Sequence, residues 1–289
     1  MIANVDNDTN GPVAVLKFGG DVVADTAKLV AVMREVAALT EAGWRFLICH
    51  GGNPQANSLT QRLNLEKKQI GGRRITDAAT LQVMKQVLAG ECNVDVVAAG
   101  TAVGLQAVGI SGTSAGTVTA IRRPPKVFSG CGPDPVDFGF VGEITDIKPQ
   151  LIQHLWAGGF TPILNTLATS SAADGDAGVC QVYNINADTV SSAIAAHIKA
   201  QHLFLMTAVP GVLRDKDDPS TRIPSLTERE ARQAITDGVV VGGMIPKIEE
   251  ALKNLSLGIG AIHILGAESG ALQGEAEQPG SRGTVLTLE

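Results

Sequence analysis

The first residues of this chain that read as regular structure form a short buried strand, a glycine loop and a helix. The run from Val13 to Phe18 is apolar and β-branched, it stops at Gly19-Gly20, and a helical-period stretch follows from Ala24 to Ala42. The order of these pieces constrains the fold strongly, because a strand that feeds directly into a helix is half of a parallel crossover unit.

The same pattern follows at once. Residues 45–49 are a second short apolar run, and His50-Gly51-Gly52-Asn53 is the loop. Pro54 then opens a helix through about Leu63, a position that suits proline because a first-turn amide needs no helical partner. Two successive units predict a parallel sheet with both glycine loops at the carboxyl edge of its strands.

Composition agrees with this class. Hydrophobic residues make up 44% and charged residues 18% of the 289 residues, with only one Tyr and two Trp, so the core must consist of aliphatic side chains. Aliphatic cores are typical of buried parallel strands flanked by helices. The length suffices for one large α/β domain with two lobes.

Charge and cysteine content exclude several classes of protein. The net charge is -6 without a long basic run, which argues against nucleic acid or an anionic membrane as a partner. The four cysteines are far apart and form no C-x-x-C pair, so neither a zinc ribbon nor a disulfide framework is expected. The first 12 residues are polar, and no apolar run reaches the roughly 18 residues of a membrane span. We therefore expect a cytoplasmic protein.

Later segments continue the alternation of helices and strands. The pattern predicts helices over 80–99, 149–157, 187–199, 227–236 and 246–258, and strands over 105–110, 117–122, 139–147, 160–165, 202–207 and 261–265. We expect a three-layer αβα sandwich with a central, mainly parallel sheet that two lobes share. Residues 1–12 are predicted to be a disordered tail, 13–170 the N-terminal lobe and 171–289 the C-terminal lobe, because the loop-like stretch 170–178 suggests the boundary.

A lysine marks the first glycine loop as a candidate phosphate site. Lys17 ends an otherwise apolar strand, and Gly19 and Gly20 leave the backbone amides beyond it bare. Such amides, together with the N-terminus of the next helix, favour an anion. A glycine pair is more often only a tight turn, but a lysine in this place needs an anionic partner or solvent.

A third loop has the same character. Gly242 and Gly243 precede a helix that carries Lys247 in its first turn, where the helix dipole disfavours a cation. A bound phosphate would offset that cost, which favours a functional role for Lys247 over a solvated surface lysine.

Other candidate residues have plain structural interpretations beside functional ones. His50 is expected to cap a strand by hydrogen bonding rather than to transfer a proton, and Asn186 or Asp188 fits an ordinary helix N-cap or first-turn acid. Arg74 lies in an exposed basic turn or holds a substrate carboxylate. No Walker A motif occurs. Residues 112–116 match the hydrolase pattern G-x-S-x-G, but a β-branched run follows where that motif requires a helix.

Taken in order, these segments resemble the acetylglutamate kinase family of the amino-acid kinase fold, over nearly the whole chain from Val13 to about Leu286. The motifs that carry the resemblance are LKFGG at 16–20, HGG at 50–52, RITDAATLQVMKQVLAGECN at 74–93, DFGFVGEITDI at 137–147, YNINADT at 183–189 and DGVVVGGMIPKIEEAL at 237–252. The resemblance implies ATP-dependent phosphorylation of the γ-carboxylate of N-acetylglutamate, in arginine synthesis, with Mg²⁺ carried by the ATP phosphates.

It also implies roles for individual residues. Lys17 and Lys247 would neutralise the phosphates, Asp188 would hold both ammonium groups, and the loops at Gly19-Gly20 and Gly51-Gly52 would surround the reacting groups. Substrate and nucleotide contacts are implied for Arg74 and Asn184 on the amino-acid substrate, and for Gly243 and Met244 beside ATP.

Three positions depart from the family pattern. Asn53 stands where the family's loop usually has a third glycine, Ala208 where an aspartate is common, and residues 111–116 replace a lysine-aspartate loop. A kinase for a carrier-protein-linked aminoadipate or glutamate, or for another N-acylated acid, is therefore an alternative. A non-catalytic amino-acid-binding domain is a remote one, since such a domain would be expected to lose Lys17, Asp188 or Lys247. The short tail favours an arginine-insensitive homodimer.

Overall fold

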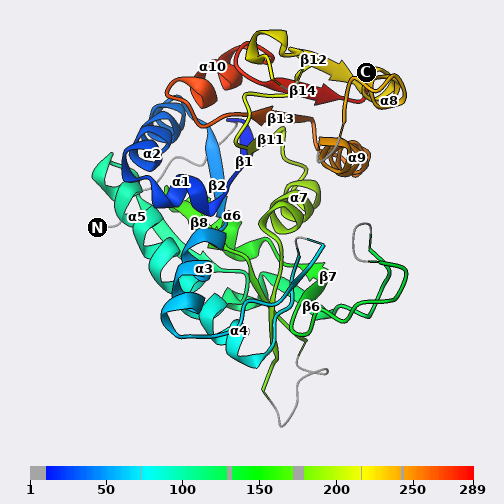
Figure 1. Cartoon of the computed structure of the whole chain (residues 1–289). Coiled ribbons are helices and arrows are strands. Elements are labelled where there is room, and N and C mark those ends of the chain that lie inside the picture. Colours follow the sequence, from blue (N-terminus) through cyan, green and yellow to red (C-terminus); the bar gives the residue numbers. More distant parts are fainter. Residues whose placement is uncertain (1–10, 72, 129–131, 172–178, 216, 242–243) are drawn as a thin grey trace, which may run out of the picture.

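In the computed structural model the described residues are 11–71, 73–128, 132–171, 179–215, 217–241 and 244–289. An eight-stranded sheet forms the centre of the protein (Figure 1). Its strands, in spatial order, are β12 (Ser225–Thr227), β14 (Thr284–Thr287), β13 (Ala261–Leu265), β11 (His202–Met206), β1 (Val13–Phe18), β2 (Arg45–His50), β8 (Thr161–Asn165) and β5 (Ala107–Ser111). All neighbours are parallel except β13 and β14.

Helices cover both faces of this sheet, which confirms the predicted three layers. On one side lie α1 (Gly20–Ala24), α2 (Thr26–Glu41), α5 (Asn93–Ala102) and α10 (Ala271–Glu277), and on the other α6 (Gln150–Ala157), α7 (Ala187–His197), α8 (Glu228–Thr236) and α9 (Met244–Leu255). β1 supplies both layers, because Ala14 and Leu16 point into one hydrophobic cluster and Val13 and Val15 into the other.

The sheet runs through both halves of the sequence, as predicted. β1, β2, β5 and β8 come from residues 13–170, while β11 to β14 come from residues 171–289, and β1 pairs in register with β11. The assignment of separate roles to the two lobes stays a prediction, and part of the proposed boundary, residues 172–178, lies outside the described residues, as do residues 1–10 of the predicted tail.

A second, four-stranded sheet was not predicted from the sequence. It consists of β10 (Val182–Asn184), β9 (Leu167–Thr169), β6 (Val118–Arg122) and β7 (Gly142–Ile147). β6 and β7 correspond to the strands predicted over 117–122 and 139–147, and they pair antiparallel. β3 (Gln69–Ile70) and β4 (Arg73–Arg74) form a separate two-stranded antiparallel sheet earlier in the chain.

The predicted helix over 80–99 is longer and less regular than expected. It starts as α4 (Ala78–Met84), widens into a π-helical segment over Lys85–Cys92 and continues as α5. Asp77 caps its start by accepting a hydrogen bond from the Thr80 amide at 2.9 Å. The first predicted helix is α2, which Asp25 caps, and the short α1 before it was not predicted. The helix α3 (Asn53–Arg62) follows β2 directly.

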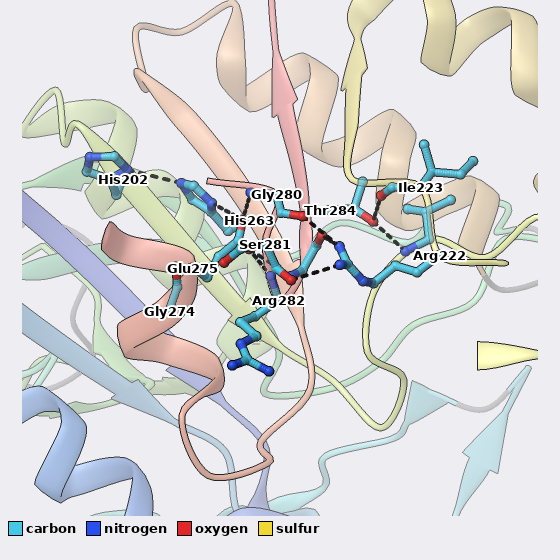
Figure 2. A network of polar contacts seen from close by, with 12 residues as sticks. His202, Arg222, Ile223, His263, Gly274, Glu275, Gly280, Ser281, Arg282 and Thr284 are labelled. Atoms are coloured by element: carbon cyan, nitrogen blue, oxygen red, sulfur yellow. Dashed lines mark hydrogen bonds and ion pairs between the residues drawn. The ribbon is translucent and has the colours of Figure 1, made fainter. Parts of the chain in front are cut away.

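Buried polar contacts hold the loop before β14 against its neighbouring elements in the second half of the chain (Figure 2). The Glu275 carboxylate accepts hydrogen bonds from the amides of residues 280, 282 and 283 at 2.7 to 2.9 Å, and from His263 Nδ1 at 2.9 Å. Arg222 donates to carbonyl oxygens of the same loop, at Gly280, Ser281 and Gly283. The loop before β14 is thus held through its amides on one side and its carbonyls on the other. No helix in the described part of the chain is both long and apolar enough to span a bilayer.

Candidate active site

The carboxyl ends of β1 and β2 open into a cavity of about 760 Å³. Because these strands are parallel neighbours, their glycine loops meet at the same edge of the sheet, as the repeated pattern predicted. Eight of the predicted site residues line this cavity, namely Lys17, Gly19, Gly20, Gly51, Gly52, Arg74, Asn184 and Asp188.

Lys17 and Asp188 form an ion pair at the inner end of the cavity. Lys17 Nζ lies 2.7 Å from Asp188 Oδ1, and the lysine side chain is only 12% exposed. The lysine is buried because its strand occupies the centre of the sheet, with β2 and β11 on either side. Its charge is therefore directed at the cavity and at the carboxylate that balances it.

The Asp188 side chain is available for this ion pair because another residue, Asn186, caps the helix. Asn186 is the N-cap of α7, and its side chain accepts a hydrogen bond from the Asp188 amide at 2.8 Å. The structural interpretation of this motif thus applies to Asn186, while the Asp188 side chain turns towards Lys17.

Lys247 lies behind the same carboxylate. Together with Asp188 and Asn254 it lines a small adjoining cavity of about 20 Å³. Burial lowers the pKa of Lys247 from its ordinary value, while the charge of Asp188 opposes that shift. Lys17 and Lys247 therefore both lie within the electrostatic influence of Asp188, and Glu250 lines the same two cavities.

The two glycine loops approach each other too closely for side chains. A Cβ on Gly20 would lie 2.6 Å from Gln55 Oε1 and 2.8 Å from the Gly52 Cα atom. A Cβ on Gly51 would come within 3.3 Å of the Gly20 amide nitrogen. Bare backbone therefore faces the cavity between the two loops, and this is the kind of surface that fits the phosphates of a nucleotide.

Arg74, on β4, has neutral hydrogen-bond partners. Its Nη2 atom donates to Asn57 Oδ1 at 2.7 Å and to Asn53 Oδ1 at 3.2 Å. Its Nε–H is buried without a hydrogen-bond acceptor among the described residues. Burial also lowers the pKa of Arg74. A half-buried guanidinium that is held by amides is well suited to bind a carboxylate.

Of the other predicted contacts, Asn184 lines the cavity and Met244 does not. Asn184 Nδ2 lies 3.4 Å from Thr76 Oγ1, and the backbone N–H of Asn184 donates to the Phe140 carbonyl at 2.9 Å. Met244 packs against the hydrophobic core and is not among the residues that line either cavity. Gly243 lies outside the described residues.

His50 and the G-x-S-x-G segment have structural roles. His50 is fully buried, and burial lowers its pKa to about 4, so its ring is neutral at ordinary pH. Residues 112–116 form a turn with a short 3₁₀ segment that leads into β6, not into the helix that a hydrolase nucleophile requires.

Several residues of the site were not found from the sequence. Asn57 holds Arg74 without lining either cavity, and it lies one helical turn after Asn53, so the i,i+4 spacing was a usable signal for a shared face. Glu250 lines both cavities, and its pKa is raised by burial and by Asp188. Arg123 and Phe128 also line the large cavity, with the guanidinium carbon 5.9 Å from the ring centroid. Glu250 lies within the motif at 237–252 but was not singled out, and no motif pointed to Arg123 or Phe128.

Comparison with known proteins identifies the family of this chain. The model of the amino acid kinase family matches residues 12–266. Curated relatives include acetylglutamate kinases of Sorangium cellulosum, 49% identical over 96% of this chain and 94% of the relative, and of Anaeromyxobacter dehalogenans, 45% identical over 94% and 98%.

Solved structures share the fold at lower identity. N-acetylglutamate synthase from Neisseria gonorrhoeae, complexed with coenzyme A and N-acetyl-glutamate, has a TM-score of 0.77 at 20% identity. The match covers 96% of this chain but only 60% of the synthase chain. Carbamate kinase from Giardia lamblia bound to AMP-PNP has a TM-score of 0.69 at 15% identity, over 97% of this chain and 100% of the kinase.

Proposed function

Since the chain belongs to the amino acid kinase family, we propose that it transfers the γ-phosphoryl group of ATP to the side-chain carboxylate of N-acetylglutamate. The products are an acyl phosphate and ADP, and the reaction belongs to arginine biosynthesis. The observation that carries the proposal is the Lys17–Asp188 ion pair between two bare glycine loops, in the same cavity as Arg74. The names of the curated relatives support the choice of substrate.

The chemistry needs charge stabilisation more than proton transfer. A carboxylate is already ionised at neutral pH, so its oxygen attacks the γ-phosphorus without a general base as the bond to the ADP oxygen breaks. Negative charge on the transferred group is then balanced by Lys17 and Lys247, while Asp188 keeps the two ammonium groups in place.

Substrate positions follow from the same cavity. Arg74 and Asn184 hold the α-carboxylate of the amino-acid substrate, and the amides of Gly20 and Gly52 lie beside the transferred phosphoryl group. ATP occupies the side of the second half, near Gly19, Gly243 and Met244. Mg²⁺ enters with the nucleotide, because this small hard cation prefers phosphate oxygens and water to an all-protein cage.

We further propose that two copies form a dimer. β5 is the last strand of the central sheet, so within the described residues its outer edge has no neighbour, and Val94 on the adjoining α5 is 62% exposed. An open strand edge beside an exposed apolar side chain favours pairing with a second copy. Light scattering after size exclusion, with and without arginine, tests this; a monomer, or an arginine-inhibited hexamer, would contradict it.

An acyl-phosphate assay tests the function. Hydroxylamine traps the product of ATP-dependent turnover on N-acetylglutamate, compared with free glutamate, N-acetylaminoadipate and a carrier-linked acid. We expect robust product from N-acetylglutamate alone. Turnover confined to one of the other acids would keep the mechanism and overturn the substrate.

A further inference from the structure

Both ring nitrogens of the buried His50 have hydrogen-bond partners. Nδ1 lies 3.0 Å from the Gly51 carbonyl oxygen, and Nε2 lies 3.0 Å from Asn93 Nδ2. The same Asn93 amide nitrogen donates to the Ile163 carbonyl at 3.1 Å, which fixes the orientation of the amide group. Since a carbonyl can only accept, His50 carries its proton on Nδ1 and accepts at Nε2.

This arrangement fixes one peptide plane of the second glycine loop. In a trans peptide the carbonyl and the following N–H point in opposite directions, so a bond that holds the Gly51 oxygen also directs the Gly52 N–H. The Gly51 amide is already bonded to the Phe18 carbonyl at 2.9 Å. The Gly52 amide, by contrast, has no acceptor within the described part of the chain, and Gly52 lines the cavity.

We infer that Asn93 is a positioning residue for phosphoryl transfer, which acts through His50 to aim the Gly52 amide at the transferred group. The inference rests on the proposed role of Gly52, and it assigns a task to a buried pair that the proposed mechanism does not otherwise use. Neither Asn93 nor His50 is among the residues that line the cavity, so their effect passes through the Gly51–Gly52 peptide.

The π-helical segment explains how Asn93 reaches this position. Asn93 directly follows the segment, and the segment's own side chains form the support beneath Gly52, where a Cβ would lie 2.9 Å from Leu88 Cδ2 and 3.0 Å from Cys92 Sγ. π-Helical turns are rare and occur often at functional sites. One helix thus supports the loop from below through Leu88 and Cys92, and from the side through Asn93.

Two replacements of His50 separate positioning from packing. In His50→Asn the side-chain amide can occupy the place of Nδ1 and still donate to the Gly51 carbonyl, whereas in His50→Gln the amide reaches the place of Nε2 and that donor is lost. We expect His50→Gln to lower kcat roughly tenfold to a hundredfold and His50→Asn clearly less, with KM for both substrates within about threefold. Glutamine is closer to histidine in size, so a packing role alone predicts the opposite order.

Asn93→Asp gives a pH signature. An aspartate cannot donate to Nε2, so the bond to Gly51 survives only while His50 is doubly protonated. The ratio of variant to wild-type kcat should therefore fall as pH rises from 6 to 9. Titratable groups on the surrounding elements are Lys17 on β1, Cys49 on β2, and Cys92 with Glu91 and Asp95 on the long helix; burial raises the pKa of both thiols to about 12, above this range.

Controls distinguish this inference from the proposed function. Val96→Ala, in a fully buried position on the same helix, should lower the melting temperature without lowering kcat. Wild-type turnover tests the proposed function, and the ranking of the variants tests the inference. Equal kcat in His50→Asn and His50→Gln, or losses of kcat that follow the loss of melting temperature as in Val96→Ala, would overturn the inference.

If a variant does not fold, ¹⁵N NMR of the wild-type histidines decides instead, since a proton on Nε2 of His50 at pH 7 contradicts the inference.

Discussion

Arg74 Nη2 lies 2.7 Å from Asn57 Oδ1, so a neutral side chain holds the guanidinium in place. A carboxylate partner would neutralise the arginine and compete with an acidic substrate. The amide oxygen fixes the direction of the guanidinium and leaves its charge available.

Asn57→Ala should therefore weaken binding of the amino-acid substrate. Loss of one such bond is worth about 1 kcal/mol, which corresponds to a roughly fivefold higher KM for N-acetylglutamate, with kcat and the KM for ATP little changed. Asn53→Gly removes the longer contact of 3.2 Å and should have a smaller effect. Steady-state kinetics with each substrate varied tests the order, and a larger effect in Asn53→Gly would contradict it.

Lys17→Met should lower kcat by a factor of about 100 to 1,000, because it removes a buried positive charge from the cavity in which we propose that phosphoryl transfer occurs. The exposed Lys28 provides a matched control, since Lys28→Met should retain wild-type turnover. Circular dichroism establishes that both variants fold. Near-normal kcat in a folded Lys17→Met would refute the proposed role.

Gly20→Ala should abolish most activity while the protein remains folded. The added methyl group would meet Gly52 Cα and Pro54 Cδ, both 2.8 Å away, and would push the two glycine loops apart. Gly90→Ala is the matched control, because no atom lies within 4 Å of a Cβ at that site. Hydroxylamine-trap rates and melting temperatures of the two variants test the contrast.

Stability should decrease as pH falls from 7.5 to 5.5. His50 has its pKa lowered to about 4 by burial, so the unfolded chain binds a proton below pH 6.5 that the folded chain does not. The free energy of unfolding should then fall by about 1.4 kcal/mol per pH unit below 6.5 for this group. Burial and the neighbouring His263 also lower the pKa of His202 to about 4, so His202 changes stability in the same direction. Urea midpoints across this range measure the slope, and a flat or rising profile would exclude it.

Glu275→Gln should destabilise the second half of the protein by about 3 kcal/mol, because a buried carboxylate that several donors share is replaced by a group with one acceptor oxygen. The exposed Glu277 on the same helix is the control, and Glu277→Gln should change the melting temperature little. Equal melting temperatures for the two variants would show that the network in Figure 2 is not a stabilising one.

The parts of the fold that a local pattern encodes could be predicted from the sequence. The buried strand that ends in Lys17, the loop at Gly51-Gly52 and the helix that begins near Ala187 follow from periodicity, glycine and capping residues, and the structure places all three at one edge of the sheet. Parallel pairing of consecutive units brings such loops together without further information.

Contacts between distant residues could not be predicted in this way. Nothing in a single sequence relates His50 to Asn93, or Arg222 to the loop near Gly280, because these partners are set by how helices and strands pack. The π-helical segment was missed for a similar reason, since its apolar pattern over Lys85–Cys92 differs little from that of an α-helix.

The π-helical segment makes this stretch of the chain intolerant of a change in length. An α-helix turns by about 100° per residue, so a deletion between Lys85 and Cys92 that restored regular winding would rotate everything after it relative to everything before it. Leu88 could then remain under Gly52, or Asn93 could remain beside His50, but not both. The helix could tolerate single substitutions. A change in the number of residues between Met84 and Asn93, however, would break the contact of Leu88 with Gly52 or the hydrogen bond of Asn93 with His50.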